Sequence, residues 1–191
     1  MKTISPRTLI LSLAVCILIS CAAKGPEIGV LGIYLEMPQA DFLKLNEKKS
    51  LGFVQSSALI LPSTIQYTST NFSWLQETFE VNVAILEDRV QYLALLSDRH
   101  TTAGAAVTLY TNIEKELKST YGAPDREIGE GNNPGFLIEQ IEKGEKMYAY
   151  CKWDETGLQH SILGNKDGDD GISVSTVFMT AESTRFLRHY D

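Results

Sequence analysis

Hydrophobic residues recur at two different spacings along the chain, and each spacing predicts a different element. Between residues 79 and 85 every second residue is a large apolar one, which is typical of a strand with one buried face. Between residues 102 and 121 apolar residues recur every three or four positions, so they share one side of a helix. They are Ala103, Ala106, Val107, Tyr110, Ile113, Leu117 and Tyr121. Gly122 and Pro124 then end this helix.

The same pattern predicts further strands and two shorter helices. Residues 29–35 indicate a short strand or an extended entry, and runs of apolar or β-branched residues predict strands at 53–61, 64–70 and 90–95. Pro38 suits the first turn of a helix that ends near Lys49. Asn133 and Pro134 suit the cap and first position of a second helix, which Gly144 stops.

Segments 147–153 and 158–163 flank a polar turn and predict a β-hairpin. Pairing Trp153 with Leu158 places His160 opposite Cys151, whereas a one-residue bulge at the turn would shift this register. The register gives the hairpin one apolar face, formed by Met147, Ala149, Cys151, Trp153, Leu158 and Ile162. The other face then carries Tyr148, Tyr150 and Lys152. Residues 172–180 alternate again and predict a last strand.

The order of these elements predicts the fold class. Strands joined by short turns are antiparallel, so we expect an α+β protein in which β-meanders pack with one long helix and one or two short ones. Residues 28–191 would form a single domain. The element order also fits two diverged halves, 28–98 and 99–191, each a helix followed by a meander, although their residues show no repeat.

The first 20 residues have the organisation of a signal peptide: a basic start, a short apolar core and a small residue before a cysteine. The sequence Leu18-Ile19-Ser20-Cys21 resembles the lipobox of bacterial lipoproteins. This resemblance implies cleavage before Cys21 and acylation of that residue, with 21–27 as a lipidated tether. Because Ala22 is not aspartate, it also implies an outer-membrane location facing the periplasm. An uncleaved helix or a plain secreted protein is the alternative.

Processing changes the charge and the cysteine count. Loss of Lys2 and Arg7 leaves 15 basic residues against 24 acidic ones, so the formal charge falls from −7 to −9. An acidic chain disfavours binding to nucleic acid, which needs clustered positive charge. Cys16 is lost and Cys21 carries lipid, so Cys151 remains the one free thiol and no intramolecular disulfide can form.

Few residues carry candidate chemistry. Cys151 and His160 are the one pair that could form a thiol–imidazole nucleophile, but no orienting carboxylate or oxyanion hole is apparent, and packing is the favoured interpretation. Residues 165–171 resemble a calcium loop, yet Asp170 stands where an EF-hand needs glycine, so a hairpin turn is favoured over weak Ca²⁺ binding. Residues 129–135 lack the spacing of a dinucleotide loop, and His100, His160 and His189 lack metal-ligand spacing.

The start of the mature chain resembles small bacterial envelope lipoproteins. Ile33, Leu35, Met37 and Phe42 follow the spacing I-x-L-x-M-x-x-x-x-F of this group. It includes the small subunit of the outer-membrane barrel-assembly machinery and proteins folded like β-lactamase inhibitor protein. The resemblance transfers no functional residue.

We therefore expect a non-enzymatic, lipid-anchored module without metal or cofactor that binds another envelope protein. Tyr148, Tyr150 and Lys152 are the candidate contact residues, because tyrosine is common at protein interfaces. A helix covering these residues would remove that role. A cell-envelope hydrolase using Cys151 and His160 is one alternative. A small-ligand or glycan-binding lipoprotein using the tyrosines is the other.

Overall fold

The computed structural model describes residues 28–57, 63–100, 102–128, 133–144, 147–164, 171–181 and 183. Within them the chain is an α+β protein, as the element order predicts. Cys21, the 1–20 leader and residues 165–170 of the calcium-like loop lie outside this description, as do residues 129–132 of the glycine-rich loop and His189.

The first half of the described chain contains one helix and six strands. They are β1 (Gly29–Val30), β2 (Ile33–Tyr34), α2 (Gln39–Lys49), β3 (Val54–Ser56), β4 (Ile65–Trp74), β5 (Glu77–Leu86) and β6 (Arg89–Ser97). The second half follows with α3 (Ala103–Tyr121), β7 (Arg126–Ile128), α4 (Pro134–Glu142), β8 (Met147–Trp153), β9 (Leu158–Gly164) and β10 (Ile172–Met179).

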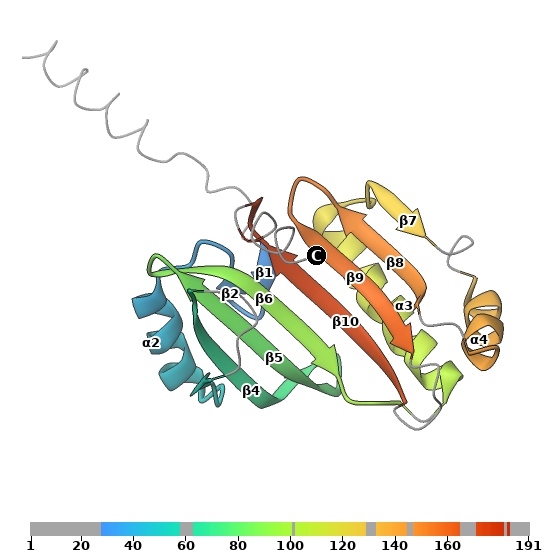
Figure 1. The fold of residues 1–191 in the computed structure, drawn as a ribbon, viewed down its shortest axis with the longest axis horizontal. Coiled ribbons are helices and arrows are strands. Elements are labelled where there is room, and N and C mark those ends of the chain that lie inside the picture. Colours follow the sequence, from blue (N-terminus) through green and yellow to red (C-terminus); the bar gives the residue numbers. More distant parts are fainter. Residues whose placement is uncertain are drawn as a thin grey trace, which may run out of the picture.

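One antiparallel sheet joins the two halves. Its eight strands run in the order β3-β4-β5-β6-β10-β9-β8-β7, so each half contributes four consecutive positions. The last strand of each half lies at the centre, where β6 pairs with β10 from Leu96↔Ser175 to Tyr92↔Met179. In Figure 1 the green strands of the first half and the orange and red strands of the second half meet along this pair.

Helices α2 and α3 pack against the same face of the sheet. Phe42 of α2 stacks edge-on against Phe53 and Tyr67, and Tyr110 of α3 stacks on His160 of β9. Strand registers place Tyr67 and His160 on one face, because both fall on the same alternation when followed across β5, β6 and β10. Figure 1 shows α3 behind β8, β9 and β10. The hydrophobic core lies between these helices and this face.

Capping residues set where the helices begin and end. The Thr102 hydroxyl accepts a hydrogen bond from the Ala105 N–H, and the Asn133 side chain accepts from Gly135 and Phe136, so both caps form. Gly122 ends α3 with a positive φ of 81°. Pro38 stands at the cap position of α2, one residue before its first turn.

The β8–β9 hairpin has the predicted register, with Trp153 opposite Leu158 and Cys151 opposite His160. Several details differ from the sequence expectation, including residues 29–35, which form the two paired strands β1 and β2. The register shifts between Met147 and Ala149, so Tyr148 falls at a bulge instead of continuing a regular alternation. Strand β3 is only Val54–Ser56, shorter than the expected 53–61, and the short strand β7 was not expected.

Candidate functional site

The β8–β9 hairpin presents different chemistry on its two faces. Toward α3 it carries the fully buried Cys151 and His160, together with Ala149, Trp153, Leu158 and Ile162. This confirms the predicted apolar face for the residues whose side chains are described. The opposite face carries the partly exposed Tyr150 and Lys152. The two faces therefore have to be considered separately.

On the buried face, both ring nitrogens of His160 have partners. Nε2 lies 3.0 Å from the backbone oxygen of Tyr110, and Nδ1 lies 3.1 Å from the backbone oxygen of Ser175 and 3.0 Å from the Thr176 hydroxyl. Both carbonyl oxygens can only accept, so a neutral ring donates its single proton to one of them. Burial lowers the pKa of His160 to about 4, against the smaller effects of its hydrogen bonds. The ring is therefore neutral near pH 7.

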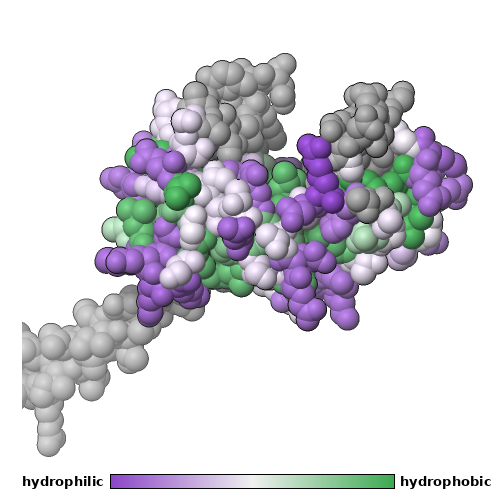
Figure 2. All heavy atoms as spheres, turned by 90° about the horizontal axis from the view of Figure 1, so that it is seen from below, coloured by the Kyte–Doolittle hydropathy of each residue, from purple (hydrophilic) through white to green (hydrophobic). Residues whose placement is uncertain are grey.

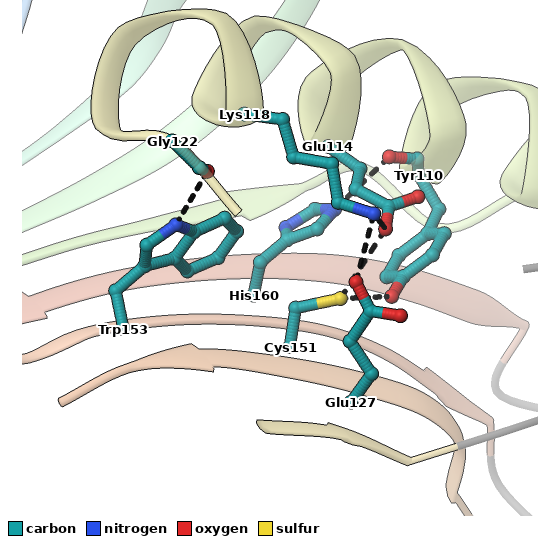
Figure 3. Close-up of polar contacts among 8 residues, drawn as sticks. All are labelled: Tyr110, Glu114, Lys118, Gly122, Glu127, Cys151, Trp153 and His160. Atoms are coloured by element: carbon teal, nitrogen blue, oxygen red, sulfur yellow. Dashed lines mark hydrogen bonds and ion pairs between the residues drawn. The ribbon is translucent and has the colours of Figure 1, made fainter. Parts of the chain in front are cut away.

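The Cys151 thiol points at other groups than the imidazole (Figure 3). Its Sγ lies 3.2 Å from the Tyr110 hydroxyl and donates to Glu114 Oε1 at 3.4 Å. Burial, together with the nearby Glu114, raises the pKa of Cys151 to about 12, although the hydrogen bond with Tyr110 lowers it. Both members of the pair are thus uncharged. A nucleophilic cysteine needs a thiolate beside a group that takes its proton, which is the opposite arrangement.

A three-residue ion cluster joins α3 to β7 beside this thiol. Lys118 Nζ lies 2.9 Å from a Glu114 oxygen and 2.8 Å from a Glu127 oxygen. Burial alone would lower the pKa of Lys118, but hydrogen bonds to Glu127 and Glu114 raise it above its ordinary value. The ammonium therefore stays charged and neutralises two converging carboxylates (Figure 3).

Potential metal-ligand atoms gather at the same place. Among the described residues, atoms of Glu114, Glu127 and Cys151 lie within 4.8 Å of one another. Lys118 already supplies the positive charge between the two carboxylates. The cluster is thus complete as a network of side chains that fixes β7 against α3.

Part of the other face of the sheet is exposed as two adjacent rows of side chains, which we call the open face. The next row on the same face, through Gln66, Ala84 and Met179, is buried. One row crosses all eight strands through Val54, Thr68, Asn82, Ala94, Val177, Gln159, Lys152 and Arg126. The second runs through Glu80, Leu96, Ser175, Ser161, Tyr150 and Ile128. Apart from Ala94, these side chains are partly or fully exposed.

The open face carries few charges and several exposed apolar groups. Val54 is 67% exposed, Ile128 57% and Leu96 38%, although all three lie on regular strands. Its charged members are Glu80, Lys152 and Arg126, and the last two form ion pairs with Asp154. Few charges, with tyrosine and aliphatic residues among hydroxyls and amides, is the composition of a protein–protein interface core.

The structure brings together only some of the residues singled out from the sequence. Tyr150 and Lys152 share the open face, whereas the side chain of Tyr148 lies outside the described part. His100 lies apart from His160, at a bridge to Ile172 before α3. No local pattern in the sequence indicated Glu127. The β6 and β10 members of the open face were not predicted either, because the pairing of these strands connects residues far apart in sequence.

Comparisons with known proteins do not assign the chain to a family. No protein-family model, curated protein or solved structure matches the chain. No helix in the described part of the chain is both long and apolar enough to span a bilayer. The fold defines the class: the described chain is an α+β protein with an eight-stranded antiparallel sheet and with helices α2 and α3 on one face.

Proposed function

We propose that this protein is a non-enzymatic bacterial envelope lipoprotein that binds a partner protein through its open face. The observation that carries the proposal is the open face itself. Two long rows of a regular sheet remain accessible and nearly free of unpaired charge, on a chain whose formal charge is −7. Exposed apolar side chains on such a face are unfavourable in water, and a bound partner would bury them.

The anchoring part of the proposal is supported by the lipobox Leu18-Ile19-Ser20-Cys21 and by the short distance to the folded part. Gly29 begins the first strand, and six residues lie between Cys21 and Ile28. An extended chain covers about 3.3–3.6 Å per residue, so the domain would sit within about 20–25 Å of the lipid. A partner of the open face would accordingly lie near the membrane, with the outer membrane as the proposed site.

Binding is tested by placing a photoreactive amino acid at Tyr150 or Val177 on the open face, and at Lys115 on the exposed side of α3 as the control. In intact envelopes, the two sheet positions should crosslink the same protein, and the helix position should not. Leu96→Arg should abolish both crosslinks while the far-UV circular dichroism stays unchanged. Equal labelling from all three positions, or labelling unaffected by Leu96→Arg, contradicts the proposal.

Anchoring is tested separately with Cys21→Ala. The variant should accumulate as an unprocessed precursor that takes up no labelled fatty acid, because the acylated sulfur is gone. Cys151→Ala is the matched control and should be labelled like the wild type. Continued labelling of the Cys21→Ala protein would refute the anchor and leave the open face untouched.

A further inference from the structure

A small cavity lies beside α3, at the end of the sheet where β4 turns into β5. It has a volume of about 300 Å³ and lies between the β4–β5 turn, the segment before α3 and the outer side of α3. Its lining includes Leu75, Glu77, His100, Gly104, Leu109 and Asn112. The β4–β5 turn lies at the lower edge of Figure 1, and Figure 2 views the molecule from that side, where hydrophobic and hydrophilic side chains are interspersed. This volume is at the small end of the range for ligand sites.

Gly104 keeps the helical wall of this cavity open. A Cβ added at Gly104 would meet no atom within 4 Å, so no packing contact requires glycine here. Glycine inside a helix is less favourable than alanine, because it loses more conformational freedom on folding. Because glycine has no side chain, the space beside Gly104 forms part of the cavity.

His100 contributes a polar atom without a partner. Its backbone is fixed, because its N–H donates to the Ile172 oxygen at 2.8 Å and its oxygen accepts from Ile172 at 3.1 Å. Nε2 of the ring is buried and has no hydrogen-bond partner. A buried polar atom without a partner is costly, and this one belongs to a residue on the cavity wall.

Leu75 contributes apolar surface from a strained position. It has a φ of 51°, in the left-handed region that leucine rarely adopts, and the following Gln76 has a φ of 67°. Its side chain is 40% exposed beside the cavity. Positive φ values at both central residues are the geometry of a two-residue hairpin turn, and this turn places Leu75 on the cavity lining.

From these four features we propose that the cavity binds a primary ammonium group carried on a short apolar stem. Glu77 supplies the negative charge, and it is the one charged residue among the lining residues. The side-chain oxygens of Asn112 and Thr108 can accept ammonium hydrogens. Leu75, Ala105 and Leu109 supply apolar surface for the methylene stem. The acidic chain attracts cations to this site.

The site is tested on the full-length protein in detergent by following the His100 ring and the Leu75 and Leu109 methyl groups by NMR. The probes are 1,5-diaminopentane and the capped peptide glycyl-lysyl-glycine, and pentan-1-ol is the uncharged control. The diamine should bind and shift all three signals, and the alcohol should bind at least about tenfold more weakly. Tighter binding of the peptide identifies a lysine side chain of another protein as the source, and tighter binding of the diamine identifies a free amine.

Three variants sharpen the test. Glu77→Gln should weaken binding of the diamine at least about tenfold, and Glu47→Gln on α2 should not change it. Gly104→Leu fills the cavity and should abolish binding, whereas Gly104→Ala should retain most of it. Both glycine variants should unfold at a temperature equal to or above that of the wild type. Absence of shifts with either amine, equal binding of pentan-1-ol, or unchanged binding by Gly104→Leu overturns the proposal.

Discussion

His160 is fully buried and neutral, and this makes folding sensitive to pH. Its pKa is about 4 in the folded protein, below the roughly 6.5 of an unfolded histidine. Between these values the unfolded chain binds more protons, so acidification favours unfolding. The contribution of His160 is complete above about pH 6.5, declines as the pH falls toward 4 and amounts to about 3 kcal/mol.

Urea unfolding at a series of pH values between about 7 and 5 measures this slope, in a range where carboxylates contribute little. We expect His160→Asn to be less stable than the wild type at neutral pH and to lose the slope. His100→Gln is the control and should retain it. A His160→Asn protein with the wild-type slope would show that another group titrates.

Lys118 neutralises a carboxylate that is almost fully buried, since the side chain of Glu114 is only 5% exposed. Lys118→Met should lower the free energy of unfolding by about 2–3 kcal/mol, because it leaves this carboxylate without its cation. The loss stays below that of a fully buried pair, since Lys118 is partly exposed. Chemical denaturation measures it.

Lys115→Met, on the exposed side of the same helix, serves as the control and should change stability by no more than about 0.5 kcal/mol. Adding Glu114→Gln to Lys118→Met should restore most of the loss, because the charge then disappears with its partner. If the double variant is as unstable as the single one, the loss comes from packing of the lysine stem.

For single residues, the sequence predicts those positions that the spacing of neighbouring residues determines. Cys151 and His160 face each other because a two-residue alternation and a tight turn set the register of one hairpin. The partners that decide their chemistry come from α3 and β7, so no pattern around Cys151 indicated that Glu114 would accept its thiol hydrogen. The same limit concealed the position of His100 beside the cavity.

Among the elements, the β4–β5 hairpin has a turn made from unfavourable residues. Leu75 and Gln76 form its two-residue loop, and both have positive φ values. Loops of this kind favour asparagine and glycine. Gln76→Gly should therefore raise the free energy of unfolding by about 0.5–1 kcal/mol.

Thermal unfolding followed by circular dichroism checks this prediction. Thr78→Gly is the matched control: it puts glycine at an exposed, extended strand position and should lower stability instead. Gln76→Gly that destabilises the protein would mean that the Gln76 side chain holds the turn.

Elements with strong internal patterns were predicted closely, and those without them were not. Helix α3 was expected at 102–121 and spans Ala103–Tyr121, because its caps and apolar stripe are local. Strand β7 consists of Arg126, Glu127 and Ile128, which show no alternation and pair only because β8 presents a free edge. The bulge at Tyr148 likewise depends on how β8 meets β9.

In the whole molecule, the central β6–β10 pair should make both halves unfold together, since the core is continuous across it. Each half has one tryptophan, Trp74 in β4 and Trp153 in β8. Trp74→Phe leaves a probe in the second half, and Trp153→Phe leaves one in the first.

In each variant, tryptophan fluorescence and far-UV circular dichroism should give coincident urea transitions. Trp153→Phe should be the less stable of the two, because the buried Trp153 indole donates to the Gly122 oxygen at 2.9 Å. A fluorescence transition that precedes the loss of circular dichroism in either variant would show that the halves unfold separately.

The pairing of β6 with β10 also has a consequence for how the chain is made. β6 lies between β5 and β10, and β10 is the last strand in the described chain. It begins about 75 residues after β6 ends. During synthesis, β6 therefore keeps an exposed edge until β10 is made, and such edges recruit other strands. We therefore expect the first half to keep an open β6 edge until residues 172–179 are available to pair with it.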